Sequence, residues 1–358
     1  MPDCSALVNH ECIDVNGFRK PCCRFDKPDK AFHVTNCTID QYKRSEFYTQ
    51  IVDAMKSNWH PGCKKCKQEE DRGDISLRNL YDQDHTFSDN IESIELSLSN
   101  KCNLMCRMCG PAFSSSWQTL VDDNDNVNKY FNKQKTAFSI NDIFYEGRDL
   151  SKLRMVKYLG GEPFITPEIL QFFRILDNST SINSITFLCT TNGTLFPKKY
   201  MSYLQKFKKV VLHVSLDGVN FVNDYIRVGK TWELVDSVID QWIHFAENNS
   251  NIEVSLFSTI QAYNIHNVSA MEDYAKKKNL KYRSALLNEP EYLSINSLPD
   301  KYMSSIKDKS NLRFFKDHKY NIDCHKRFIE YTKTIDDIHN VNIKQYIPEL
   351  EQVIDEIL

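Results

Sequence analysis

Residues 99–111 read SNKCNLMCRMCGP and contain three cysteines, Cys102, Cys106 and Cys109, separated by three residues and then by two. Thiols this close together usually bind a metal, but a closed zinc site normally has four ligands. A 4Fe–4S cluster tolerates three thiolates and leaves one iron free to bind another group. Taken alone, the triplet leaves zinc and an iron–sulfur cluster about equally open.

The surrounding pattern predicts a parallel sheet. Six segments have the alternating or apolar pattern of β-strands, and the triplet follows the first of them. These segments are residues 94–99, 154–159, 184–191, 209–216, 252–260 and 281–287. Helix-like stretches lie between the later strands, at 167–177, 197–207, 232–248 and 266–278, and the first two begin at a proline. Alternating strands and helices predict right-handed β/α units around a parallel sheet.

Polar or glycine-bearing loops follow four successive strands. After the triplet come Gly160-Gly161-Glu162-Pro163, then Thr191-Asn192-Gly193, then Ser215-Leu216-Asp217-Gly218. Each of these loops alone would be an ordinary turn. Because the carboxyl ends of parallel strands are where such folds bind ligands, their coincidence predicts a ligand site at this edge.

Together, these four motifs resemble those of the radical S-adenosylmethionine (SAM) enzymes, over about residues 90–290. The resemblance implies a partial, TIM-like (β/α)6 barrel. It implies that Cys102, Cys106 and Cys109 bind a 4Fe–4S cluster and that SAM chelates the fourth iron. In that family an electron from the cluster cleaves SAM to methionine and a 5′-deoxyadenosyl radical, which abstracts hydrogen from a substrate.

The resemblance also assigns SAM contacts to residues of these loops. The run Gly160–Glu162 would receive the methionine ammonium, and Asn192 and Ser215 would reach the ribose or the methionine end. Met108 would pack near the adenine, and Arg227 would pair with the SAM carboxylate, as a guanidinium commonly does.

Strand alternation indicates which side chains face the reaction chamber. If Ser215 points into the barrel, His213 does so too, and Glu95 faces inward on the first strand. We therefore expect His213 and Glu95 to be candidate substrate-facing residues, although an interior histidine is more often a hydrogen-bonded core residue. The catalytic residues are otherwise unknown.

A second group of cysteines precedes the barrel. Residues 1–75 have few large apolar residues, so we expect a loop-rich segment held by a metal. A glycine before a cysteine, followed by a CxxC pair, is similar to the auxiliary-cluster modules called SPASM or twitch domains, which usually follow the core. The expected ligands of a second 4Fe–4S cluster are Cys4, Cys22, Cys63 and Cys66, with Cys23 or Cys12 as substitutes. Zinc is the alternative, because four thiolates suit it equally well.

Composition limits the other possibilities. The chain has 358 residues, 41% of them hydrophobic and 26% charged, which describes an ordinary globular protein. A net charge of -3 gives no reason to expect nucleic acid or an anionic membrane as a partner. The N-terminus has no signal-like pattern and no apolar run is long enough to span a bilayer, so we expect a cytoplasmic protein. Its twelve cysteines then favour metal binding over disulfides.

The expected organisation is a cysteine-rich auxiliary module at 1–85, a radical SAM core at 90–290 and a helical C-terminal extension at 291–358. Family members with auxiliary modules often act on peptides or proteins, which makes these the first expected substrates. A small metabolite is the alternative substrate, and a non-catalytic iron–sulfur or zinc protein for electron transfer or binding is the alternative function. The resemblance further implies an electron donor such as flavodoxin or ferredoxin.

Overall fold

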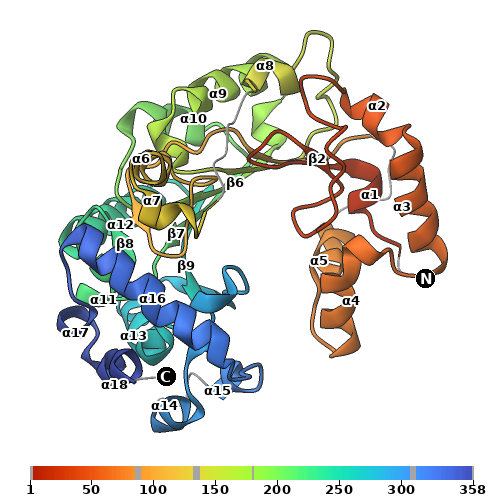
Figure 1. Ribbon diagram of the computed structural model, residues 1–358. Helices are drawn as coiled ribbons and strands as arrows, with labels where there is room; N and C mark the ends of the chain where they lie inside the picture. The colour runs from red at the N-terminus through yellow and green to blue at the C-terminus, as the bar shows by residue number, and fades with distance from the viewer. Residues whose placement is uncertain (1–2, 85–89, 132–137, 180, 307–311, 357–358) are drawn as a thin grey trace. The chain divides into compact units, whose positions relative to one another are not determined.

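A computed structural model describes residues 3–84, 90–131, 138–179, 181–306 and 312–356 of the chain (Figure 1). The chain divides into two compact units. Unit 1 comprises Met1–Lys101, Gln134–Cys189 and Lys198–Val211. Unit 2 comprises Cys102–Lys133, Thr190–Pro197 and Leu212–Leu358.

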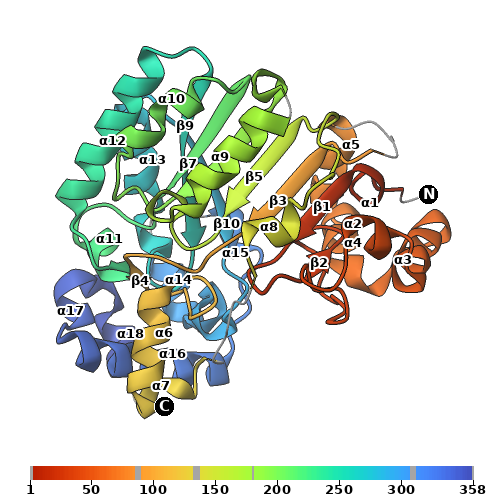
Figure 2. The same cartoon turned by 90° about the horizontal axis from the view of Figure 1, so that it is seen from above.

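Unit 1 is built on a mainly parallel sheet, whose neighbouring strands β1, β3 and β5 lie side by side in Figure 2. Its strands follow the order β2-β1-β3-β5-β6, and only the β1–β2 pair is antiparallel. The bounds are β1 His10–Ile13, β2 Arg19–Lys20, β3 Ser93–Ser97, β5 Met155–Leu159 and β6 Thr186–Thr191, the last two residues of which belong to unit 2. The register aligns Cys12 with Glu95 and Glu95 with Lys157.

The two faces of this sheet differ in polarity. On one face Ile94, Leu96 and Val156 are fully buried. Helix α9 (Glu168–Ser179) packs there through its aromatic side chains, with the Phe172 ring 5.4 Å from that of Tyr158. The other face carries Cys12, Glu95 and Lys157 in neighbouring positions. Alternation along each strand therefore separates an apolar helix-covered face from a polar one.

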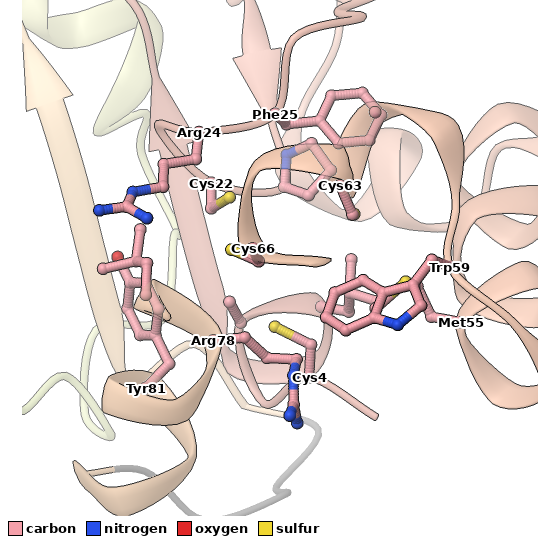
Figure 3. Close-up of a pocket in the computed structure, with 15 residues that line it drawn as sticks. Cys4, Cys22, Arg24, Phe25, Met55, Trp59, Cys63, Cys66, Arg78 and Tyr81 are labelled. Carbon is pink, nitrogen blue, oxygen red and sulfur yellow. The ribbon is translucent and has the colours of Figure 1, made fainter. Parts of the chain in front are cut away.

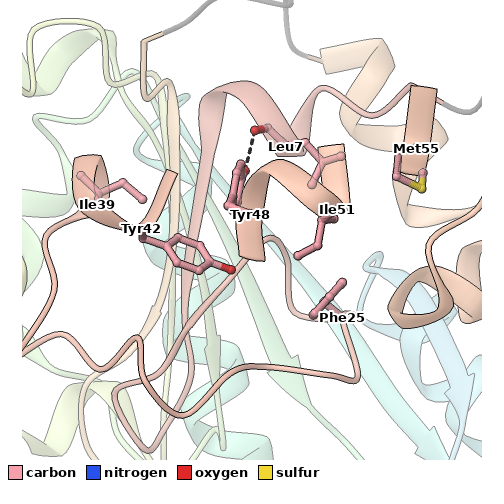
Figure 4. Close-up of a cluster of buried hydrophobic side chains, with 7 residues drawn as sticks. All are labelled: Leu7, Phe25, Ile39, Tyr42, Tyr48, Ile51 and Met55. Carbon is pink, nitrogen blue, oxygen red and sulfur yellow. Dashed lines mark hydrogen bonds between the residues drawn. The ribbon is translucent and has the colours of Figure 1, made fainter. Parts of the chain in front are cut away.

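The N-terminal part of unit 1 has an apolar core of its own (Figure 4). This core joins α1, α2 and α3 and consists of Leu7, Phe25, Ile39, Tyr42, Tyr48, Ile51 and Met55. Besides α9, unit 1 contains seven described α-helices. Their bounds are α1 Ala6–Asn9, α2 Ile39–Lys43, α3 Glu46–Ser57, α4 Lys64–Asp71, α5 Leu77–Asp84, α8 Ile140–Ile143 and α10 Met201–Leu204. The expectation that this segment lacks a good core was wrong, because apolar residues far apart in the sequence converge on the inner face of α3.

Unit 2 holds three strands in the order β7-β9-β10 and a small antiparallel pair, β4 with β8. The strands are β4 Met105–Cys106, β7 Lys209–Ser215, β8 Arg227–Val228, β9 Ile252–Ile260 and β10 Lys281–Leu286, with β7 beginning in unit 1. Helices α12 and α13 connect successive strands, α12 preceding β9 and α13 preceding β10. Helix α16 is the longest of the C-terminal helices (Figure 1). The helices are α6 Ser115–Asp123, α7 Asp125–Asn128, α11 Phe221–Ile226, α12 Trp232–Glu247, α13 Val268–Lys277, α14 Asp300–Ser305, α15 Leu312–Phe315, α16 Ile322–His339, α17 Ile343–Tyr346 and α18 Glu351–Asp355.

The predicted fold class is confirmed. All six predicted strands are present within one or two residues of the expected bounds, as β3, β5, β6, β7, β9 and β10. The intervening helices and the helical C-terminal part are present too. Strands β1 and β2 were not predicted, and they add the N-terminal segment to the edge of β3. The predicted boundaries 1–85, 90–290 and 291–358 stay a prediction. Within the described part of the chain, no helix has both the length and the apolar character needed to cross a membrane.

Candidate functional site: a three-cysteine loop and a four-cysteine pocket

The loop that carries the cysteine triplet is held by strand pairing within unit 2. Cys106 lies on β4, which pairs antiparallel with β8 so that Cys106 faces Arg227 in the ladder. The indole Nε1 of Trp117 donates to the carbonyl oxygen of Cys106 at 2.9 Å. This loop therefore has a regular backbone, fixed from two sides, rather than that of a free turn.

The three thiols lie close together. The Cys109 thiol hydrogen-bonds the sulfur of Cys106, which lowers the pKa of Cys106 and raises that of Cys109. The charge of Cys102 also acts on Cys109. Cys106 is buried, whereas Cys102 and Cys109 are half-buried. The loop thus brings the three thiols near one another, with Cys106 and Cys109 in direct contact.

Asn192 contacts the triplet directly. Its Nδ2 lies 3.7 Å from the sulfur of Cys102 and donates to Oδ1 of Asn103 at 2.8 Å. Its Oδ1 accepts from the backbone N and the hydroxyl of Thr194. This network fixes the Asn192 amide against the first cysteine of the loop, so the Thr-Asn-Gly motif places an amide donor beside the Cys102 sulfur.

Arg227 lies beside the same thiols and is buried. Its Nη1 donates to Oδ2 of Asp217 at 2.6 Å, and Oδ1 of Asp217 accepts from the backbone N of Thr259. Burial alone would lower the pKa of Arg227, but Cys106 and Asp217 raise it overall. The buried Nε of Arg227 has no hydrogen-bond partner among the described residues. A buried donor without a partner costs free energy, and a bound anionic group that accepted its hydrogen bond would recover that cost.

Three further predicted residues of unit 2 lie on β7 or in the cysteine loop. Ser215 ends β7, and Met108 lies between the second and third cysteines; both are half-buried. His213 is half-buried on β7, where its Nδ1 is 2.6 Å from the hydroxyl of Ser255. The expectation that an interior histidine is hydrogen-bonded therefore fits His213, and its contact with substrate stays a prediction.

The glycine motif of unit 1 packs against its own chain. The backbone N of Gly161 donates to the carbonyl of Ser99 at 2.8 Å, and that of Glu162 donates to the carbonyl of Lys101 at 2.7 Å. A Cβ on Gly161 would lie 2.3 Å from the Lys101 oxygen, and Gly160 has φ +145°. Side chains are therefore excluded at both positions. These hydrogen bonds hold the three residues that precede Cys102.

Two predicted carboxylates of unit 1 are buried and have partners. Glu162 is fully buried, and its Oε1 accepts from the backbone N of Phe164. Glu95 is buried on the polar face of the sheet and pairs with Lys157, with 3.1 Å between Oε2 and Nζ. Glu95 therefore faces the side that alternation predicted, as half of an ion pair.

The four cysteines predicted for the front segment line one pocket of unit 1 (Figure 3). Cys4 precedes α1, Cys22 follows β2, Cys63 lies in the turn before α4, and Cys66 lies in the first turn of α4. The other lining residues are mainly apolar or aromatic and include Phe25, Met55, Trp59 and Tyr81.

Burial in this pocket raises the pKa of three of its thiols, those of Cys4, Cys22 and Cys63. The pKa of Cys4 and that of Cys63 rise to about 12, and Cys63 and Cys66 each contribute to the rise at Cys4. Burial also raises the pKa of Cys22, and the neighbouring Cys23, Cys4 and Cys66 raise it further. Cys4, Cys22 and Cys63 therefore lie in surroundings that favour the neutral thiol when no metal is bound.

The substitute ligands lie elsewhere. Cys12 is on β1 in register with Glu95, and Cys23 hydrogen-bonds the Glu95 carboxyl group. Neither lines the four-cysteine pocket. Within the described residues, no three His, Cys, Asp or Glu side chains come close enough to hold a single metal ion.

Sequence reasoning missed the residues that hold the loop. Arg107, inside the triplet, is fully buried and pairs with Asp336 of α16. A charged residue between two ligand cysteines was a possible signal for Arg107. The sequence carries no comparable signal for Asp336, because 229 residues separate the partners.

The fold and the loop define a class of protein, which a family comparison identifies. The Radical SAM superfamily model matches residues 96–245, a segment that contains the triplet and the three glycine-bearing motifs. The chain therefore contains a radical SAM domain, and the superfamily is one of enzymes. A SPASM or twitch module stays a prediction.

Several curated relatives share this domain. A GTP 3′,8-cyclase of Alkaliphilus oremlandii is 29% identical over 135 residues, which cover 37% of each chain. The radical SAM cyclopropyl synthase TigE of Paramaledivibacter caminithermalis is 24% identical over 222 residues, or 59% of this chain and 44% of TigE. The chain thus spans less than half the length of these two relatives.

Solved structures show a weaker likeness. The anSMEcpe structure with bound AdoMet has 16% identity and a TM-score of 0.44, covering 64% of this chain and 60% of the other. The structure of Streptococcus suis SuiB bound to precursor peptide SuiA has 16% identity and a TM-score of 0.36, covering 81% and 64%. At these TM-scores the likeness carries no functional argument.

Proposed function

We propose that this protein is a radical SAM enzyme that uses a 4Fe–4S cluster at Cys102, Cys106 and Cys109 to cleave SAM reductively. The observation that carries this proposal is the group of three neighbouring thiols beside the unpartnered Nε of Arg227. Three thiolates with an open iron position suit this cofactor. When bound, the cluster supplies the electron that converts SAM to methionine and a 5′-deoxyadenosyl radical, which abstracts hydrogen from the substrate.

Residues of unit 2 fit the polar groups of SAM. Asp217 holds one edge of the Arg227 guanidinium and leaves Nε to donate to the SAM carboxylate. The Asn192 amide is placed to donate to the Cys102 sulfur, and hydrogen bonds to cluster sulfurs tune the reduction potential. Ser215 and Met108 would contact the ribose and the adenine.

The glycine motif completes the proposed SAM-binding set. Gly160, Gly161 and Glu162 would receive the methionine ammonium, which requires backbone carbonyls and a carboxylate. Their support is indirect, because the hydrogen bonds to residues 99–101 fix the backbone immediately before Cys102.

We further propose a second 4Fe–4S cluster bound by Cys4, Cys22, Cys63 and Cys66. Its support is the convergence of these four thiols on one mainly apolar pocket. Such surroundings exclude water and favour a group whose thiolate charges are neutralised by iron. Zinc remains the alternative, since it accepts the same four thiolates.

The proposed substrate is a peptide or a protein, with a small metabolite as the alternative. Glu95 and His213 are the candidate substrate contacts, and a flavodoxin or ferredoxin would supply the electron. The substrate class rests on the resemblance to family members with auxiliary modules.

Anaerobic reconstitution tests the enzymatic proposal. The purified full-length chain is loaded with iron and sulfide, reduced, and mixed with SAM, and 5′-deoxyadenosine is quantified. We expect 5′-deoxyadenosine from the wild type and none from a Cys102/Cys106/Cys109→Ala variant. A cluster-loaded wild type that forms none, while a control enzyme does, would instead support a non-catalytic iron–sulfur protein.

Metal analysis of the same triple variant tests the second cluster. We expect the variant to retain iron and sulfide, because the pocket cysteines are intact. Zinc in place of iron, after anaerobic purification, would overturn the second cluster and leave the enzymatic proposal standing.

A further inference from the structure

The cysteine loop is tied to the C-terminal helix α16 through Arg107, the residue that follows Cys106. The Arg107 side chain is fully buried, and its Nη2 donates to Oδ1 of Asp336 at 2.6 Å. Its Nε donates to the carbonyl of Tyr225 at 2.8 Å, and its guanidinium carbon lies 3.6 Å from the Tyr225 ring centroid. A buried guanidinium depends on such partners, since an unpaired buried charge is strongly destabilising.

Asp336 is itself held in place on three sides. Its Oδ1 also accepts from the hydroxyl of Tyr225 at 2.7 Å, and its Oδ2 accepts from the backbone N of Ile343 at 2.8 Å. The carboxylate therefore links α16, α11 and the start of α17 to the loop. Such a fixed acceptor leaves Arg107 little freedom to change position.

The loop backbone is held by the same elements. The hydroxyl of Tyr331, also on α16, donates to the carbonyl of Arg107 at 2.7 Å. The backbone N of Arg107 donates to the carbonyl of Ile226 at 2.8 Å. Both backbone groups and the side chain of this one residue thus have partners, and α16 provides two of them.

We propose that Asp336 and Tyr331 of α16 are positioning residues for the cluster: they hold Arg107, and through it the spacing of Cys106 and Cys109. The inference rests on the proposed function of the triplet and assigns α16 a role in SAM binding beyond core packing. Outer partners of metal ligands commonly change metal affinity about 10- to 100-fold when they are removed.

The test uses Asp336→Asn and Tyr331→Phe in the full-length, reconstituted protein. Tyr331→Phe removes a single hydrogen bond to the loop, and Asp336→Asn removes the charge opposite Arg107. The matched controls are Asp337→Asn, exposed on the same helix, and Tyr292→Phe, whose ring packs 5.2 Å from that of Tyr331. Should Asp336→Asn fail to fold, Arg107→Met/Asp336→Leu removes both charges together.

The readouts are the SAM-responsive EPR signal of the reduced cluster, the Kd for SAM, and the rate of iron loss to a chelator. We expect altered g-values, a SAM Kd raised about tenfold and iron loss faster by about tenfold in the Asp336 variants, with smaller changes in Tyr331→Phe. The melting temperature of each variant shows whether a change in these readouts reflects general unfolding. Both controls should match the wild type in every readout.

The two possible failures are distinguishable. A wild type without any SAM-responsive EPR signal would refute the proposed function, and the inference with it. A wild type with that signal, together with Asp336 and Tyr331 variants that match it in EPR, SAM Kd and iron loss, would refute the inference alone.

Discussion

The three-cysteine loop and the four-cysteine pocket hold their thiols in opposite ways. In the loop a guanidinium and a side-chain amide lie beside the sulfurs, and hydrogen bonding lowers the pKa of Cys106. In the pocket, mainly apolar and aromatic side chains surround the thiols, and the two arginines that also line it, Arg24 and Arg78, are paired with Glu69 and Glu70. Burial there raises the pKa of Cys4 and of Cys63 to about 12. The loop suits a group that exchanges a polar ligand, and the pocket suits one that is fully enclosed.

This contrast teaches that the number of cysteines is only part of a site's chemistry. Three thiols beside a buried guanidinium suit an anionic partner, because the Nε of Arg227 has a hydrogen bond still to donate. Four thiols in an apolar pocket satisfy a cluster without any outside ligand. The predictions below separate the two sites, from the largest expected effect to the smallest.

The largest effect is expected for Cys106→Ala. The variant should lose 5′-deoxyadenosine formation by at least about 100-fold, because it removes one of the three cysteines that residues 99–111 contain. Iron held by the pocket should remain. Product analysis by chromatography, with iron and sulfide assays on the same sample, measures both. Unchanged product formation would break the contrast between the sites.

Gly161→Ala should have the next largest effect. The new Cβ would lie 2.3 Å from the Lys101 carbonyl oxygen, so the backbone leading to Cys102 must move. We expect about a tenfold loss of SAM cleavage with the pocket iron retained. The control is Gly73→Asn, at a turn with open space around the glycine and a φ that asparagine tolerates. Equal activities of the two variants would contradict a close packing of Gly161 against the Lys101 carbonyl oxygen.

Cys63→Ser should affect stability more than SAM cleavage. Removing one pocket ligand should release the metal of this site and lower the melting temperature by several degrees, because metal binding there contributes to folding. SAM cleavage should stay within about twofold of the wild type, because the loop keeps its ligands. Iron content, the melting temperature and 5′-deoxyadenosine formation are measured on the same sample. If 5′-deoxyadenosine formation falls together with the other two, the two sites depend on one another.

The smallest effect concerns Asp224 on α11, next to the strand that pairs with the loop. Burial and the nearby Glu233 raise the pKa of Asp224 from 3.8 to about 6. The carboxyl group therefore favours the folded state while it is protonated, and this contribution is lost as the pH rises through about 6. Partial hydration reduces the effect to about 1 kcal/mol. Asp224→Asn should melt about 1–2 °C higher than the wild type near pH 7.5 and equally near pH 4, by calorimetry. A constant difference across this range would exclude titration of Asp224 as the cause.

The strands and the cysteines were predictable for local reasons. Alternation over five or more residues marks β5 and β7, and ligand spacing is a short-range pattern, so both are visible in the sequence. The grouping of Cys4, Cys22, Cys63 and Cys66 into one pocket also agrees with the sequence-based choice of ligands. The role of each cysteine stays a prediction.

The remaining features depend on contacts that no local pattern encodes. Strand β1 has only four residues and joins the sheet through β3, more than 80 positions later. Gly160 and Gly161 were predicted to contact SAM. The structure shows that they also approach the backbone of Ser99 and Lys101 closely, a contact that the sequence does not reveal. The Asp217–Arg227 pair likewise required the fold to bring a loop and a short strand together.

The tie between the loop and α16 also sets the order in which the protein can mature. Arg107 meets the Tyr225 carbonyl across 118 residues, the Tyr331 hydroxyl across 224 and Asp336 across 229. During synthesis the loop emerges well before its partners on α16. Until residue 336 has left the ribosome, Arg107 lacks its partners Tyr331 and Asp336, and the cysteine loop lacks these contacts with α16. The full set of contacts that hold the loop can therefore form only after α16 has been synthesised.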